Sequence, residues 1–399
     1  VLRGQQIDGR FDAMNSSLTF LAPTLDYNDP QTVVLRFQRN STRFADLANT
    51  RNQGASAKGI ESLGQGHTLY DAVVTMNDAY ADIARAYDLL SGEIHASTKT
   101  ALIQDSRFVR DAAMTRLRNQ ADPATSLQSS VWTQTLGSWN DTQSDGNAAG
   151  MTHRTHGLLV GGDKALGDWH IGALGGYSYS NIDSHARQSN SRSNSLHLGV
   201  YAGRQWQRWA LRTGAAYSHH DIKTRRSAEV NGYTDRLSAN YQAGVLQTYA
   251  ELGYRLQAGH VLLEPFGNLA YTHLRTDGFH EQGEAAALQS HNQSDDNVFS
   301  VLGLRTSVPL TVGKASAQFH ATLGWQHAYG TVRPTATHAF KGGDPFTVQA
   351  APLARDGALL TAGLDVELTD TSRLGVGYQG QFGSGLEQHG VKVDFRWRF

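Results

Sequence analysis

The hydrophobic pattern changes its period twice along this chain of 399 residues. Over residues 1–40, apolar residues such as Leu35 and Phe37 alternate with polar ones, which predicts short strands. Over about 41–119, apolar residues recur at spacings of three and four, which predicts amphipathic helices. Beyond Pro123 the period becomes two and stays so to the C-terminus. The pattern therefore predicts a short β-segment, a helical segment and a long β-domain.

Segments of the β-domain alternate between apolar and polar residues in about twelve places. Most run about 9 to 13 residues, the length that a tilted strand needs to cross a bilayer, whereas a soluble strand averages about 5 or 6. Aromatic residues cluster near the predicted strand ends, in the pairs Trp132 with Trp139, Trp206 with Trp209, Tyr177 with Tyr179, and Trp325 with Tyr329. These clusters are typical of the interfacial girdles of a transmembrane barrel.

The connections between the predicted strands sort by length. Those after even-numbered strands are short, about four to eight residues, and those after odd-numbered strands are mostly long, about 13 to 26 residues, as in 222–240 and 331–356. Only 383–388 is a short exception. We therefore expect a mainly β fold, a 12-stranded antiparallel transmembrane β-barrel with a lumen helix. It would lie in the outer membrane of a Gram-negative bacterium with its long loops extracellular and its C-terminus periplasmic.

Composition excludes several other functions. The 35 Lys and Arg nearly balance the 36 Asp and Glu, so we expect no nucleic-acid partner. With no Cys, disulfides, thiolate zinc sites and cysteine nucleophiles are excluded. The chain has no Gly-x-Ser-x-Gly, His-Glu-x-x-His or Walker motif, and His153 and His156 would point to opposite faces of a strand. We therefore expect no catalytic residue, cofactor or metal in this chain.

One predicted helix, at about Thr98–Asn119, is basic and only modestly apolar. It carries four arginines, Arg107, Arg110, Arg116 and Arg118, against Asp105 and Asp111. Its 22 residues would span about 33 Å, close to the hydrocarbon thickness of a bilayer. On local sequence alone, a solvated surface helix is the competing interpretation.

Several short stretches resemble one family when they are taken in their order along the chain. They are 44–48 (FADLA), 50–53 (TRNQ), 89–97 (LLSGEIHAS), 106–112 (SRFVRDA), 131–132 (VW), 263–266 (LEPF), 298–305 (VFSVLGLR) and 391–399 (VKVDFRWRF). Over essentially its whole length the chain resembles the C-terminal translocator of type V autotransporters, with the end of the passenger stalk before it.

The resemblance implies a division of the chain into four parts. Residues 1–40 would end a β-helical passenger stalk, 41–97 form a helical junction, 98–121 a basic linker helix through the pore, and 122–399 the barrel translocator. Such a protein anchors and exports an N-terminal passenger to the cell surface. The passenger, for example a protease or an esterase, would lie upstream of this chain. The alternative is a self-standing porin or adhesin barrel whose loops carry the function.

Charged residues on the polar faces of the strands are candidates for the lumen lining. They are Arg212, Glu251, Arg255, Glu264, Asp365 and Glu367. We hypothesise that some of them pair with Arg107, Arg110 or Arg116 of the lumen helix, which also carries Asp111, and so hold the helix in the pore. Simple hydration of these charges is the alternative.

The last nine residues have one apolar face, on which Phe395, Trp397 and Phe399 lie. A last strand ending in Phe resembles the signal read by the barrel-assembly machinery. Expected partners are therefore that machinery, periplasmic chaperones, outer-membrane lipid with lipopolysaccharide, and the passenger itself. Some family members cut the lumen helix between two asparagines. Here Asn119 is followed by Gln120, so we do not expect that cleavage.

Overall fold

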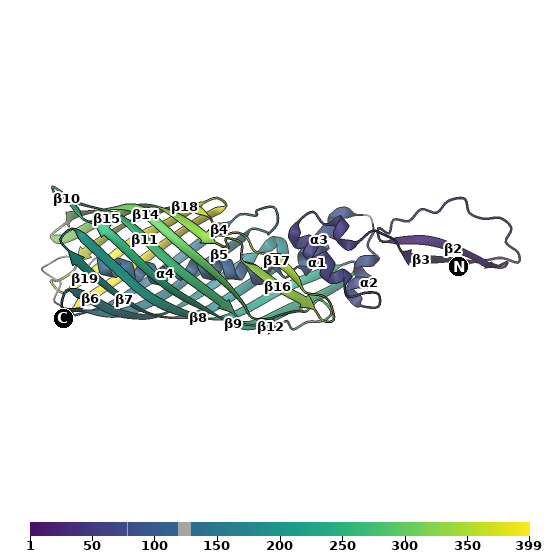
Figure 1. Ribbon diagram of the computed structural model, residues 1–399, viewed down its shortest axis with the longest axis horizontal. Helices are drawn as coiled ribbons and strands as arrows, with labels where there is room; N and C mark the ends of the chain where they lie inside the picture. The colour runs from purple at the N-terminus through teal and green to yellow at the C-terminus, as the bar shows by residue number, and fades with distance from the viewer. Residues whose placement is uncertain (78, 119–128) are drawn as a thin grey trace.

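The computed structural model describes residues 1–77, 79–118 and 129–399. A barrel occupies one half of its length, a cap of helices follows, and a β-hairpin near the N-terminus lies farthest from the barrel (Figure 1). We call the barrel end that meets the cap the loop end and the opposite end, where the C-terminus lies, the turn end (Figure 1).

Among the described residues, twelve antiparallel strands form the barrel wall, and β20 pairs with β4 to close it. They are β4 (Ser130–Thr142), β5 (Met151–Leu166), β6 (Trp169–Ser184), β7 (Ser189–Trp206), β8 (Trp209–Val230), β9 (Tyr233–Tyr254), β11 (Val261–Thr276), β14 (Gln293–Val312), β15 (Ala315–Gly330), β18 (Asp356–Glu367), β19 (Ser372–Gly383) and β20 (Leu386–Arg398). The short strand β10 (Leu256–Ala258) extends the turn between β9 and β11. The predicted fold class is confirmed.

The barrel strands run 12 to 22 residues, so most of them are longer than the sequence pattern suggested. The predicted loop 222–240 is in fact the paired ends of β8 and β9, which meet at Asn231 and Gly232. Both turn residues have positive φ, 44° and 82°, as a tight two-residue hairpin requires. The predicted loop 331–356 likewise contains a hairpin of β16 (Thr335–Phe340) and β17 (Phe346–Gln349).

Side chains alternate strictly across the wall. On β7 the outward Leu196 and Leu198 are 61% and 68% exposed, whereas the inward Ser195 is buried. An apolar outer face and a polar inner face are typical of a barrel surrounded by lipid. Trp132, predicted to belong to an aromatic girdle, is instead buried in the lumen, where its indole donates to the Tyr201 hydroxyl at 2.7 Å.

The helices precede the barrel in the chain. They are the 3-10 helix η1 (Phe44–Leu47), α1 (Arg51–Glu61), α2 (Thr68–Val74), α3 (Tyr80–Leu90) and α4 (Glu93–Arg118); a second 3-10 helix, η3 (His185–Arg187), follows β6. α4 begins five residues before the predicted Thr98 and has 26 residues, about 39 Å. Asn119 and Gln120 lie outside the described residues. No helix in the described ranges is both long enough and apolar enough to cross a membrane.

The cap is formed by α1–α3 together with connections from the loop end of the barrel. Its sheet has the order β12 (Phe279–His280), β13 (Leu288–Ser290), β16, β17. Buried in its core are Phe20, Phe44, Ile60, Leu69, Tyr87, Leu90, Phe340 and Phe346. Because this core draws on helices before the barrel and on hairpins between its strands, the cap and the barrel mouth form one packed unit.

The N-terminal segment is an antiparallel sheet with the order β1 (Leu2–Arg3), β3 (Thr32–Arg39), β2 (Leu21–Asp29). Both strand pairs of this segment are antiparallel. Leu35 and Phe37 on β3 are exposed.

Gly92 joins α3 to α4 in a left-handed conformation, with φ of 65°. A Cβ at this position would collide with the Leu288 side chain in the cap core. We expect Gly92→Ala to destabilise the cap by about 2 kcal/mol or more, because backbone strain and overpacking add. Proteolysis of residues 41–92 in increasing urea measures the effect. Gly64→Ala is the matched control, since Gly64 has φ of 74° and open space around it; an equal loss there would show that packing at Leu288 contributes nothing.

Candidate functional site

Helix α4 lies inside the barrel, against the inner face of β5–β9 and β11 (Figure 1). It is buried along almost its whole length although it is not apolar; Lys99, Arg107 and Arg110 are among its buried side chains. A buried polar helix needs partners for its polar groups from the surrounding wall. Those partners define the candidate site.

The apolar part of this contact lies near the middle and the turn-end half of α4. Phe108, Val109, Ala112, Ala113, Met114 and Leu117 pack on Trp132, Leu136, Leu159, Leu174, Tyr201, Ala216, Tyr249 and Ala270 of the wall. Alanines on the helix let its backbone approach the strands closely. The inward aromatic side chains of the wall thus form the seat of the helix.

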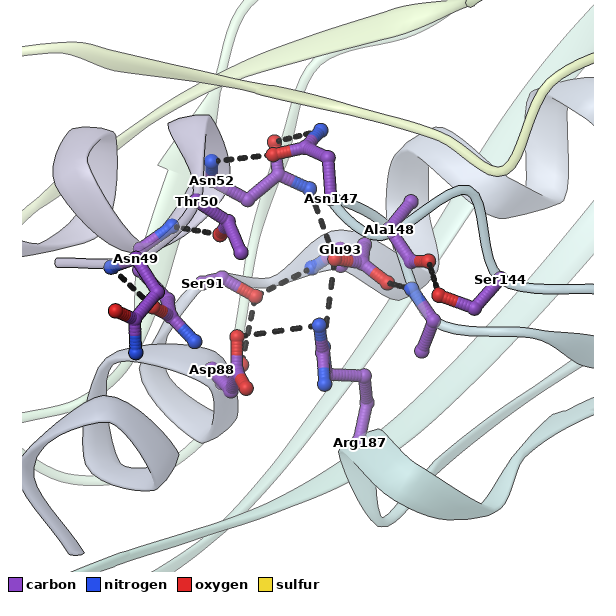
Figure 2. A network of polar contacts seen from close by, with 12 residues as sticks. Asn49, Thr50, Asn52, Asp88, Ser91, Glu93, Ser144, Asn147, Ala148 and Arg187 are labelled. Carbon is purple, nitrogen blue, oxygen red and sulfur yellow. Dashed lines mark hydrogen bonds and ion pairs between the residues drawn. The ribbon is translucent and has the colours of Figure 1, made fainter. Parts of the chain in front are cut away.

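Figure 2 shows the start of α4, where the Glu93 carboxylate binds three other segments. Asn52 of α1 donates its side-chain amide at 2.8 Å, the backbone amide of Ala149 donates at 2.7 Å, and Arg187 donates at 3.3 Å. Burial raises the pKa of Glu93, and Arg187, Ala149 and Asn52 offset only part of that rise. Arg187 also pairs with Asp88 of α3 at 3.1 Å. This carboxylate joins the helix to the cap and to two barrel connections.

A second buried cluster holds α4 two residues further on, at His95. Glu281, in the connection after β12, pairs with Arg226 of β8 at 2.6 Å and contacts His95 of α4 at 3.0 Å. It also accepts the Leu288 backbone amide at 2.8 Å. Glu281, Arg226 and His95 are almost completely buried, so this carboxylate compensates a cation that water does not reach.

Along the middle of α4, Asp105 accepts hydrogen bonds from the hydroxyls of Thr155 and Ser180 at 2.9 and 2.8 Å. His153 of β5 lies 3.1 Å from the same oxygen. The helix therefore contributes a carboxylate as well as cations, and small inward hydroxyls of the wall satisfy it.

Near its turn end, α4 is fixed by an ion pair between Arg116 and Asp163 of β5. The two contacts are 2.5 and 2.8 Å and engage both carboxylate oxygens. Tyr201 donates to Asp163 at 3.0 Å. Both members of the pair are buried, and a two-pronged arginine–carboxylate contact fixes orientation as well as distance.

The other predicted helix residues have neutral partners or partial exposure. Arg107 donates to the side chain of Gln381 at 2.5 Å, and Arg110 donates to that of Gln247 at 3.3 Å. Asp111 is half-buried and lines the cavity described below. Among the described residues, Arg116 is the one of the three cations in the pairing hypothesis that forms an ion pair with a carboxylate.

Glu251 and Glu264 lie side by side on β9 and β11, and cations of the wall surround them. Arg212 lies 2.9 Å from Glu251 and 2.8 Å from Glu264. Arg305 of β14 lies 2.5 and 2.9 Å from the same two carboxylates, and Arg255 lies 3.1 Å from Glu264. This cluster joins four barrel strands, β8, β9, β11 and β14.

The helix meets this wall cluster through Arg118, whose guanidinium lies 3.6 Å from Glu251. Among the described residues, the ion pairs of Glu251 and Glu264 include none with Arg107, Arg110 or Arg116. These two acids therefore compensate wall arginines first and contact the helix at its last described residue.

Asp365 and Glu367 of β18 also pair within the wall. Asp365 contacts Arg373 at 2.5 Å. Glu367 lies 3.8 Å from Arg373, 3.7 Å from Arg396 and 3.3 Å from Arg398. These pairs join β18, β19 and β20, beside the seam where the barrel closes.

A cavity of about 860 Å³ lies between the turn-end half of α4 and the wall from β9 to β20. Its lining includes Arg107, Arg118, Arg305, Arg373, Lys392 and His320. Toward the loop end, by contrast, the lumen is packed: Leu102 and Ile103 of α4 contact Val332 and Leu353 from the connections. The helix thus fills the lumen near the loop end and leaves space beside it near the turn end.

Sequence reasoning missed the most direct partner of the helix. Asp163 is not among the predicted lumen-lining residues, because the polar stretch that follows Gly162 is typical of a turn. The strand β5 continues to Leu166, and Asp163 is on the inward face of the strand, as Gly161 and Leu159 are. Extending the inward–outward alternation four residues beyond Leu159 would have identified Asp163 as a lumen residue. In the described ranges no group of three or more His, Asp or Glu residues is placed to hold a metal ion.

Comparisons with known proteins agree with this geometry. The family model described as the autotransporter beta-domain matches residues 131–379. An extracellular serine protease of Serratia marcescens is 33% identical over 441 aligned positions, covering 98% of this chain and 42% of the relative. The chain therefore spans less than half the length of that relative.

Two solved structures have the same fold. The translocator domain of autotransporter NalP from Neisseria meningitidis matches with a TM-score of 0.65 at 18% identity, covering 77% of this chain and all of that one. The beta domain of the Bordetella autotransporter BrkA matches with a TM-score of 0.54 at 20% identity, covering 68% of this chain and all of that one. With the family match over residues 131–379, the chain belongs to the autotransporter family, and its barrel is an outer-membrane translocator domain.

Proposed function

We propose that this barrel carries a passenger attached before Val1 to the cell surface, with the loop end outside the cell and the C-terminus in the periplasm. One observation supports this most directly. Residues 1–77 and 79–92 lie at the loop end, and α4 runs from there down the lumen to the turn end, where β4 begins (Figure 1). A chain in this arrangement connects its N-terminal part to its barrel through the pore.

Pore size limits how a passenger crosses. A twelve-stranded barrel holds about one helix and its polar lining, so a folded domain does not fit. The passenger crosses unfolded or as an extended hairpin, and α4 then occupies the lumen while the cap lies at the loop end. We assign residues 1–40 to the stalk end, 41–97 to the junction, 98–121 to the pore segment and 122–399 to the barrel.

The passenger we propose is a serine protease. The Serratia relative bears that name, and this chain aligns with 42% of it, so the remainder of such a protein has room for the enzyme. In our proposal Phe395, Trp397 and Phe399 form the signal that the barrel-assembly machinery reads after periplasmic chaperones deliver the chain. Phe395 and Trp397 are exposed on the outer face of β20, and Phe399 is exposed just beyond its end, which supports a docking strand.

Surface display tests the proposal. A small cysteine-free reporter is placed before Val1 behind a signal peptide, and intact Gram-negative cells are treated with protease. We expect cleavage of the reporter in the full-length protein and protection when residues 391–399 are deleted. A reporter that stays protected beside a folded, ion-conducting barrel would overturn export and favour the porin alternative.

A further inference from the structure

Four cations gather on the outer face of the barrel near the loop end: Arg154, Arg192, Lys223 and Arg225, here called the basic patch. All four side chains are exposed. Arg192 of β7 is directly opposite Lys223 of β8. Arg154 of β5 continues the same row, separated from Arg192 by one strand, about 10 Å.

The position of the patch relative to the apolar band follows from β7 itself. Its outward side chains change from Val200, Leu198 and Leu196 through Asn194 to Arg192. Arg192 lies four residues beyond the last apolar one, about 13 Å along the strand and about 10 Å in height at the usual tilt. Long basic side chains at that height reach the headgroup layer and not the hydrocarbon.

The patch lacks carboxylate partners in the part of the chain that the structure describes. Two of the neighbouring acids bind other groups: Asp183 accepts from Asn181, and Asp221 accepts from Gln242 at 3.0 Å. Like charges directly opposite each other destabilise a strand pair unless a counter-charge lies between them. Arg192 and Lys223 therefore form a place where a bound anion would stabilise the protein.

The opposite wall has a different outer surface at the loop end. There, exposed carboxylates pair with histidines at 2.8, 2.7 and 3.0 Å, in the pairs Asp296 with His273, Asp356 with His327, and Glu387 with His389. On these strands carboxylate–histidine pairs take the place of the row of cations on β5, β7 and β8, so the two walls differ in their outer surface at the loop end.

We propose that the basic patch binds the phosphate groups of the outer-leaflet glycolipid, lipopolysaccharide. This inference rests on the proposed orientation, in which the loop end faces the outer leaflet. Arginine guanidinium groups bind phosphate oxygens through two parallel hydrogen bonds, and Lys223 adds a point charge. The acyl chains of the same lipid would lie on Leu196 and Leu198, directly below the patch.

The test uses the purified full-length protein in detergent, with lipid A as the probe in a binding titration. We expect Arg192→Gln, Lys223→Gln and Arg225→Gln together to weaken binding about 100-fold, at about fivefold for each cation. Arg275→Gln is the matched control, because Arg275 is exposed on the outer face of β11 near the loop end but outside the patch. Dephosphorylated lipid A is expected not to bind, and millimolar inorganic phosphate not to compete.

Equal binding by the triple variant and the native protein would overturn the site, as would an equal loss in Arg275→Gln. Competition by inorganic phosphate would show that the patch binds the free anion, and would overturn the lipid as its specific ligand. Reporter display on intact cells is measured in parallel for the native protein. Display by a native protein that does not bind lipid A rejects the lipid site alone, whereas binding in detergent without display rejects the proposed function and leaves the site standing.

Discussion

Replacing Asp163 with Asn is expected to free α4 from the barrel wall and to raise the ion conductance of the purified barrel several-fold. The carboxylate now engages Arg116 at 2.5 and 2.8 Å and also accepts from Tyr201. Asparagine keeps the shape but loses the charge, so Arg116 is left buried without its counter-charge. Breaking a buried pair in this way costs about 3 to 5 kcal/mol. Conductance in planar bilayers and the temperature at which the barrel stops migrating as a folded species on gels measure the two effects.

Asp168→Asn is the matched control for this variant. Asp168 lies on the adjoining turn and pairs with Arg204 at 2.6 Å, but both side chains are exposed. An exposed pair contributes less than about 1 kcal/mol, so neither stability nor conductance is expected to change. If Asp163→Asn behaved like this control, the ion pair with Arg116 would not be what keeps the helix in the lumen.

Replacing Glu281 with Gln is expected to loosen the cap from the barrel mouth by about 3 to 5 kcal/mol. Glu281 compensates Arg226, accepts the Leu288 amide and contacts His95 of α4. Its loss leaves a buried guanidinium unpaired at the point where helix, strand and cap meet. Faster proteolysis of residues 41–92, with the barrel still folded, is the expected result.

The same carboxylate gives the cap a dependence on pH. Burial alone would raise the pKa of Glu281, but the charge and hydrogen bonds of Arg226 and the contact with His95 outweigh it, so the pKa lies below the ordinary 4.5. A lowered folded-state pKa gives stability that is present above pH 4.5 and is lost as the pH falls toward the folded-state value. We expect the cap to loosen below pH 4.5 in the native protein and to depend less on pH in Glu281→Gln.

Glu229→Gln serves as the control for both measurements. Glu229 lies on the nearby end of β8, and its contact with Arg85 of α3 is long, 3.9 Å, and exposed. Little change is expected, because water already solvates both charges. Proteolysis that is equally slow in Glu281→Gln and Glu229→Gln would show that the cap is held by its apolar core alone.

Secondary structure and the two faces of each strand could be predicted because both are local. Successive side chains of a strand point to opposite sides, so Phe395, Trp397 and Phe399 had to share a face whatever the rest of the chain did. The same alternation placed Glu251, Glu264 and Asp365 on the polar face, and all three are inside the barrel. Even the hairpin at Asn231 and Gly232 was readable, since Asn-Gly is a strong turn signal. We misread it because the flanking strands are polar where they extend beyond the apolar band.

The partners of these residues could not be predicted in the same way. Arg116 and Asp163 are 47 positions apart, and their contact depends on the stagger of the strands and the rotation of α4, which no local pattern encodes. Trp132 shows the same limit: an aromatic residue near a strand end fits either a girdle or the seat of a helix. The sequence by itself thus determined that the chain forms strands with an apolar outer face and a polar inner one, since alternation is a property of the strand. Which charges meet across the lumen was decided by the tertiary structure, because closure of the barrel around α4 sets those distances.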